Sequence, residues 1–205
     1  MTAKTHPTRV ARRSDWEDQD TRRRRIWIGV AILGVVAFVA MLGYLIYQQS
    51  LPVPHPGRDI PIQGRSHIPV GQAHDPYNSE PPSSGPHYDT PAAAGFYDQA
   101  PADEYLVHSM EHGYAIIWYN CDQYKDGTCD QLKAKVKDAM GAAGVSAITG
   151  TLKLIAVPRA GQKTVIALSA WGHIDTPDGG FSKQEIIDFI RGYRDGANAP
   201  EPSLP

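Results

Sequence analysis

The longest uninterrupted hydrophobic stretch of the chain is residues 26–47, which read IWIGVAILGVVAFVAMLGYLIY without a charge or a proline. As an α-helix this stretch is about 33 Å long, which is enough to cross a hydrocarbon core of about 30 Å. Trp27 near one end, and Tyr44 and Tyr47 near the other, are typical of the two bilayer interfaces. The pattern predicts one transmembrane helix.

The charge pattern gives this helix a direction. Residues 1–25 carry eight Lys or Arg and four acidic residues, whereas the whole chain has a formal net charge of −2. Because basic flanks stay in the cytoplasm, Arg22–Arg25 predict a cytoplasmic tail at residues 1–25, and the rest of the chain then lies outside the cell membrane. A cleaved signal is the alternative, but it has a shorter apolar core and small residues at its cleavage site, whereas YQQSLPVPHP follows here. The basic run adjoins the membrane, so its expected partner is the lipid bilayer and not nucleic acid.

After the hydrophobic stretch the chain has no regular periodicity for some 50 residues. The prolines and glycines of residues 48–66 predict an extended spacer. Residues 67–103 are also rich in turn formers, but their His, Tyr and Phe side chains supply aromatic surface that a disordered linker lacks. We therefore expect a long, ordered, proline-rich loop that lies over the domain.

Regular patterns begin at Ala102. Capping residues and helical spacing predict three helices, at residues 102–113 and 130–144 and from Ser182 to about Gly192. Apolar β-prone runs predict three strands, at residues 115–120, 152–159 and 163–172, the last two forming a hairpin. The order α-β-α-β-β-α predicts one small α+β domain at residues 67–196, with antiparallel strands and helices packed on one face. Residues 197–205 read as a disordered tail.

The chain has two cysteines, Cys121 and Cys129, and both lie outside the membrane in the expected topology. The Asp126-Gly127 pair between them is a turn signal that would bring the two ends of the segment together. An oxidising compartment favours a structural disulfide. Free or metal-binding thiols and a redox-active pair are the alternatives, although the C-x-x-C spacing is absent.

Histidines are the main candidates for chemistry, and seven of the eight follow the hydrophobic stretch. On a helix, His108 and His112 share a face and can bind one metal ion. On a strand, His108, Met110 and His112 would share a side and suit a soft ion such as copper(I). The sequence does not identify a cofactor, and copper and zinc are the candidates if a metal is bound. Histidines that only pack and form hydrogen bonds are the alternative to any metal.

Two further patterns bear on catalysis. His108 to His112 also spells H-x-x-E-H, the motif of a class of zinc proteases, but Gly113 follows at once and no third ligand is marked. His87 ends the rigid segment PPSSGPH, yet no G-x-S-x-G motif accompanies it. The sequence therefore favours a non-catalytic domain and leaves a metallohydrolase or a thiol oxidoreductase as the alternatives.

Several longer motifs occur in one order: HIPVGQ, YNSEPPSSGPHY, GFYD, LVHSMEHGYAIIWYNC, AWG and FIRGYRDGANAPEP. In these motifs the chain resembles, over roughly residues 60–202, the domain-of-unknown-function family 3105 (DUF3105), which is found mainly in bacterial membrane-anchored proteins. The family's Pro-Pro-[Ser/Thr]-Ser-Gly-Pro-His element matches Pro81–His87, and its His-Ser-x-Glu-His-Gly element matches His108–Gly113. The resemblance implies that His87, His108 and His112 belong to one site, and it supplies no activity.

Two functions fit these patterns. The first is an extracytoplasmic domain that binds a metal ion or a small ligand through its clustered histidines. The second is a non-catalytic interaction or assembly subunit of a membrane complex, whose partners would be other membrane proteins.

Overall fold

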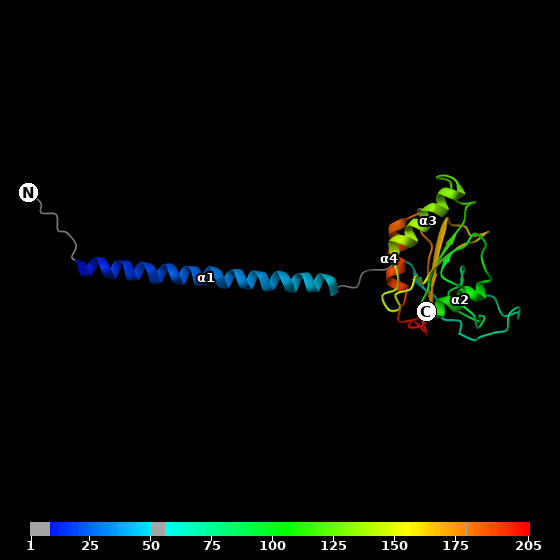
Figure 1. Ribbon diagram of the computed structural model, residues 1–205, viewed down its shortest axis with the longest axis horizontal. Coiled ribbons are helices and arrows are strands. Elements are labelled where there is room, and N and C mark those ends of the chain that lie inside the picture. Colours follow the sequence, from blue (N-terminus) through cyan, green and yellow to red (C-terminus); the bar gives the residue numbers. More distant parts are fainter. Residues whose placement is uncertain (1–8, 51–55, 179) are drawn as a thin grey trace, which may run out of the picture. The chain divides into compact units, whose positions relative to one another are not determined.

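A computed structural model describes residues 9–50, 56–178 and 180–205. The chain divides into two compact units, residues 1–53 and 54–205, and each is described by itself. Residues 1–8 of the expected cytoplasmic tail and residues 51–55 of the expected spacer lie outside the described residues. The unit at residues 54–205 contains the sheet and the other helices (Figure 1).

The first unit contains the helix α1 (Arg9–Ser50). Its segment Thr21–Tyr47 is long and apolar enough to cross a membrane, and the side chains of this segment are exposed. A helix that is apolar on every side needs an apolar environment around it. Among the described residues, this segment is the candidate membrane span.

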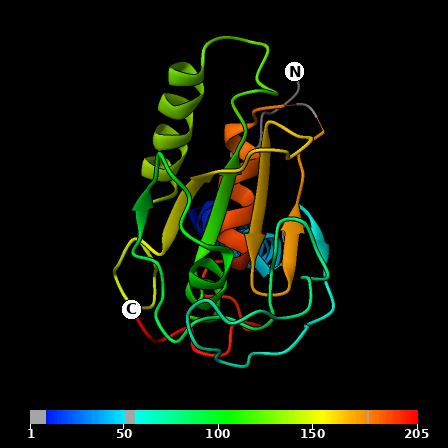
Figure 2. The same ribbon diagram turned by 90° about the vertical axis from the view of Figure 1, so that its right-hand side faces the viewer.

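The second unit is built on one mixed sheet of six strands, in the order β1-β6-β5-β3-β4-β2. The α+β class is therefore confirmed. The strands are β1 (Arg58–Asp59), β2 (Gly95–Phe96), β3 (Ala115–Tyr119), β4 (Leu154–Pro158), β5 (Ile166–Ala170) and β6 (His173–Asp175). In the centre, β3 is parallel to β4 and antiparallel to β5, so that Trp118 lies between Val157 and Ala167. Figure 2 shows the strands lying side by side.

The strand pairing differs from the expected antiparallel sheet in two respects. First, β2–β4 and β3–β4 are parallel pairs. The helix α3 (Cys129–Ala143) lies between β3 and β4 in the chain, and such a crossover allows the second strand to run in the same direction as the first. Second, the predicted hairpin is wrong, because β3 lies between β4 and β5. The connecting residues pass the end of β3, where Arg159 N donates to Tyr119 O and Asn120 N donates to Val165 O.

Helices cover both faces of the sheet, not one. One face packs against α3 and α4 (Lys183–Tyr193), which contribute side chains such as Val136 and Phe189 to one apolar cluster. The other face packs against α2 (Asp103–Glu111), whose Leu106, Val107 and Met110 belong to a second cluster. Because both faces are covered, every residue of β3 is buried, and the strand reads as a continuous apolar run instead of an alternating one.

Local signals account for the helix ends. Thr128 caps α3 in a reciprocal capping box with Gln131, and the Ser182 side chain accepts a hydrogen bond from Glu185 N at the start of α4. The predicted disulfide is present between Cys121, two residues after β3, and Cys129, the first residue of α3. It closes the loop that joins the strand to the helix.

Two segments that we expected to be irregular are part of the domain. Within the expected spacer, β1 pairs with β6, and Ile60 is buried. In the expected disordered tail, Glu201 N donates to Glu111 O at 3.0 Å, and the buried Lys153 Nζ donates to Pro202 O at 2.7 Å. Composition predicts poor core packing for such a tail, but it cannot reveal hydrogen bonds to the main chain of a distant helix.

Candidate metal centre

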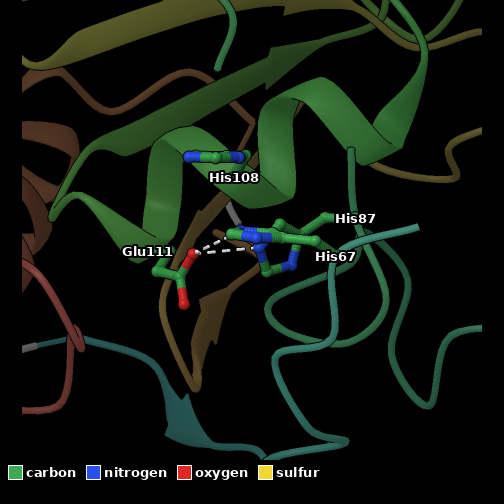
Figure 3. Close-up of side chains that lie close together, drawn as sticks. All are labelled: His67, His87, His108 and Glu111. Atoms are coloured by element: carbon green, nitrogen blue, oxygen red, sulfur yellow. Dashed lines mark hydrogen bonds and ion pairs between the residues drawn. The ribbon is translucent and has the colours of Figure 1, made fainter. Parts of the chain in front are cut away.

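Four side chains from distant parts of the sequence meet beside α2: His67, His87, His108 and Glu111 (Figure 3). Each offers one nitrogen or oxygen atom that can bind a metal, and these atoms all lie within 4.8 Å of one another. His108 and Glu111 belong to α2, whereas His67 and His87 come from the irregular segment between β1 and β2.

The two loop histidines are placed by main-chain hydrogen bonds. Ile68 N donates to His87 O at 2.8 Å and His87 N donates to Ser66 O at 3.0 Å, so the two segments run side by side. Gly85, two residues before His87, has a φ of +126° and packs so closely on the Tyr77 ring that a Cβ would lie 3.0 Å from it. Glycine is therefore required there to bring the loop into this position.

The helix α2 presents His108 and Glu111 on one face because they are three residues apart. Arg159 holds the start of this helix in place. Its guanidinium binds both carboxylate oxygens of Asp103, the first residue of α2, at 2.9–3.1 Å, and lies 4.6 Å from the centre of the ring of Trp118 in β3. The helix is thereby fixed against the sheet. At the other end, Gly113, with a φ of +84°, allows the chain to leave the helix directly after His112.

Three histidines are held in one tautomer by main-chain oxygens. Nδ1 lies 2.8 Å from Gly85 O in His87, 2.5 Å from Tyr88 O in His108, and 3.1 Å from Pro205 O in His112. A main-chain oxygen only accepts hydrogen bonds, so each Nδ1 carries the proton and donates. In the neutral ring, Nε2 then carries a free lone pair. Histidines that bind a metal are commonly oriented in this way.

The Nε2 atoms face groups that also offer lone pairs. His87 Nε2 lies 2.9 Å and His67 Nε2 lies 3.4 Å from the same oxygen, Glu111 Oε2. His108 Nε2 lies 3.1 Å from His112 Nε2. The His87–Glu111 and His108–His112 contacts need a cation between the two atoms, either a proton or a metal ion, whereas a neutral His67 can donate its own Nε2–H to Glu111. Two ligand atoms of one tetrahedral zinc ion, each about 2.1 Å from it, lie about 3.4 Å apart, which is close to these distances.

Burial makes an unneutralised Glu111 unfavourable. Its side chain is 4% exposed and that of His87 is 0% exposed, whereas His67 is 52% exposed and forms the open side of the cluster. The partners of the Glu111 carboxylate in the described chain are imidazoles, which are cations only when protonated. Burial, together with the neighbouring His112, His87 and His67, lowers the pKa of His108, although its hydrogen bond to Tyr88 O opposes the shift. The neutral ring, which is the metal-binding form, is thereby favoured.

The structure brings some of the predicted site residues together and separates another. His87 and His108 both belong to the cluster, and His112 adjoins it through His108. Met110 is fully buried in the apolar cluster between α2 and the sheet, so it points away from the histidines. The arrangement of His108, Met110 and His112 on one side of a strand is wrong, because this segment is a helix.

The predicted metal ligands did not include two members of the cluster, His67 and Glu111, although Glu111 is the acid of the H-x-x-E-H motif. Glu111 could have been found from its spacing, because it is three residues after His108 on a predicted helix. His67 opens the motif HIPVGQ, but its position beside His87 depends on hydrogen bonds between two loop segments, and no spacing rule predicts those.

A sequence model of the family described as "Protein of unknown function (DUF3105)" matches residues 67–205. The chain belongs to this family. The DUF3105 region therefore contains all four residues of the cluster, His112 and the C-terminal segment that contacts α2. No curated protein and no solved structure matches the chain.

Proposed function

We propose that the DUF3105 domain of this chain binds a divalent transition-metal ion through His67, His87, His108 and Glu111. The observation that carries the proposal is the convergence of Nε2 lone pairs and a buried carboxylate, with Nδ1 of His87 and His108 held by main-chain oxygens. Without a cation this arrangement places lone pairs against each other in a buried site. With a cation the same contacts become ligand bonds.

The ligand set suits zinc and copper(II). Three imidazoles and one carboxylate match the nitrogen and oxygen ligands of four-coordinate zinc. Copper(II) accepts the same ligands and, at equal access, binds more tightly than zinc. Copper(I), which prefers sulfur, is disfavoured because Met110 lies in the apolar cluster.

The same proposal places the domain outside the cell membrane. In it, Thr21–Tyr47 is an uncleaved membrane anchor, and Arg22–Arg25 hold the N-terminal end in the cytoplasm. A disulfide between Cys121 and Cys129 fits an oxidising compartment. The domain would then meet metal ions that are available outside the cytoplasm.

Metal binding to the full chain in detergent tests the proposal. After removal of metal with a chelator, the wild-type chain should take up one zinc ion per chain in equilibrium dialysis. His87→Gln and Glu111→Gln remove a direct ligand, so each should weaken zinc binding by at least about 100-fold. His74→Gln is the matched control, because His74 pairs with Glu104 outside the cluster at 3.2 Å.

Equal zinc content in the wild type, His87→Gln and Glu111→Gln would contradict the proposal. A chain that binds no zinc or copper but always co-purifies with other membrane proteins would favour an assembly subunit instead.

A further inference from the structure

His112 and Glu201 form a second group of metal-binding side chains next to the cluster. His112 lies one helical turn after His108, and the two Nε2 atoms are 3.1 Å apart. On its other side, His112 Nε2 lies 3.6 Å from Glu201 Oε2. His112 Nδ1 is occupied by Pro205 O, so its Nε2 lone pair also faces this group.

The main chain holds Glu201 beside α2. Glu201 N donates to Glu111 O at 3.0 Å, which ties the C-terminal segment to the last residue of the helix. The buried Lys153 Nζ donates to His112 O at 2.8 Å and to Pro202 O at 2.7 Å, so one ammonium group fixes both sides of the contact. The main chain of the C-terminal segment is therefore held beside α2, which places Glu201 next to His112.

The two groups differ in their access to solvent. The side chains of His112 and Glu201 are 12% and 45% exposed, whereas those of His87 and Glu111 are 0% and 4% exposed, and His67, at 52%, is the exposed member of the inner group. His108 connects the groups, because it is a member of the cluster and its Nε2 lies 3.1 Å from His112 Nε2. A cation at His112 and Glu201 would thus be nearer to water than a cation at Glu111.

We propose that His108, His112 and Glu201 form an outer position for the metal ion, through which it enters and leaves the inner position formed by His67, His87, His108 and Glu111. His108 has one Nε2 lone pair and can bind an ion at only one position at a time. The chain therefore holds one ion in two alternative positions, and His108 remains a ligand in both. This inference rests on the proposed metal binding.

Movement between the positions replaces one ligand by another instead of releasing a bare ion. As the ion moves outward, it exchanges three inner ligands for His112 and Glu201. The three are His67, which is the most exposed inner ligand, and the buried His87 and Glu111. Each step keeps nitrogen or oxygen ligands on the ion. A site of this kind suits an ion that is delivered and passed on, because the ion changes ligands in steps and is never without them.

The kinetics of zinc exchange in the full chain in detergent test the outer position. Zinc release from the chain is followed by the absorbance of the complex that zinc forms with an excess of a coloured chelator. Zinc uptake by the metal-free chain is followed by the loss of absorbance as zinc leaves the same chelator. His112→Gln and Glu201→Gln should each slow both uptake and release by about tenfold, so that the affinity changes less than either rate. His74→Gln and Glu104→Gln are matched controls, because they alter a His–Glu pair that includes a residue of α2 but lies outside both positions.

A second experiment isolates the outer position by removing the inner one. His87→Gln/Glu111→Gln should still bind one zinc ion per chain, more weakly than the wild type, and addition of Glu201→Gln should abolish this residual binding. Circular dichroism of every variant verifies that the variant is folded. Because Glu201→Gln alters a largely exposed side chain, this variant still tests the outer position if His112→Gln does not fold.

Three results would overturn the outer position while leaving the proposed metal binding intact. These are unchanged exchange rates in both His112→Gln and Glu201→Gln, a loss of affinity in His112→Gln with unchanged uptake, and two zinc ions per wild-type chain at saturation. A wild-type chain that binds no ion overturns both proposals.

Discussion

The two faces of the sheet are buried by different kinds of side chain. The face under α3 and α4 is covered by a large apolar cluster that includes Val136, Phe189 and Ile190. The face under α2 has a smaller apolar cluster, and the elements that cover it also carry buried polar side chains: Ser83, Ser84, His87, His108, Ser109 and Glu111.

The difference indicates a division of tasks between the faces. Burial of apolar side chains stabilises the fold, whereas a buried polar group is unfavourable unless it has a partner. Some polar groups under α2 are satisfied within the chain, as when Ser109 Oγ donates to Ala92 O at 3.0 Å. The Nε2 atoms and the Glu111 carboxylate face one another instead. We infer that the α3–α4 side supplies most of the stability, whereas the α2 side carries the polar groups of the candidate metal centre.

The largest effect should follow from a cavity on the α3–α4 side. Phe189 is fully buried there, and Phe189→Ala should lower the free energy of unfolding by about 3–5 kcal/mol. Urea unfolding of the full chain in detergent, followed by near-ultraviolet circular dichroism, measures this change. If the faces act separately, zinc should stabilise the folded variant by the same increment as the wild type. Loss of that increment in Phe189→Ala would show that the two faces are coupled.

The disulfide belongs to the α3–α4 face of the sheet, because Cys121 packs against the apolar cluster there. Its two cysteines are eight residues apart in sequence, so Cys121→Ser/Cys129→Ser should lower the free energy of unfolding by about 2–3 kcal/mol through the added entropy of the unfolded chain. Zinc affinity in the same variant should equal that of the wild type. A tenfold weaker affinity would mean that the loop after β3 helps to position the cluster.

The sequence predicts local structure on both faces better than it predicts contacts. The helix at residues 102–113 is confirmed as Asp103–Glu111, and the capping role of Ser182 is also confirmed, because periodicity and caps depend on neighbours in the sequence. The hairpin was wrong because the turn at Ala160–Gln162 does not determine which strand lies next to β4. That choice depends on the path of α3.

The candidate site follows the same rule. The helical spacing predicted that His108 and His112 lie together, and their Nε2 atoms are 3.1 Å apart. The approach of His67 to His87 and of Glu201 to His112 depends on hydrogen bonds between segments that are far apart in sequence. Local patterns contain no information on these pairs.

His173 allows the sharpest comparison between the faces, because it stacks on Tyr193 of α4, at 4.1 Å between ring centres. Its Nδ1 faces Asp59 Oδ1 at 2.9 Å, and its Nε2 lies 2.7 Å from the amide nitrogen of Asn198. Nε2 therefore has an N–H donor as its partner, whereas Nδ1 lies beside the carboxylate without forming a hydrogen bond of good geometry. The neighbours of this ring are a carboxylate and an amide donor, whereas the Nε2 atoms of His87 and His108 face a carboxylate and another imidazole.

The smallest predicted effect is the pH dependence that His173 confers. Burial lowers the pKa of His173, although Asp59 opposes the shift. Below about pH 6.5, the ordinary value for histidine, the unfolded chain therefore binds more protons than the folded chain, and stability falls as the pH falls. In the presence of a metal chelator, His173→Gln should lose less stability than the wild type between pH 7.5 and pH 5.5, by urea unfolding, with His74→Gln as the control. Parallel curves for the wild type and His173→Gln would mean that Asp59 compensates the burial in full, and the contrast with the cluster under α2 would then rest on geometry alone.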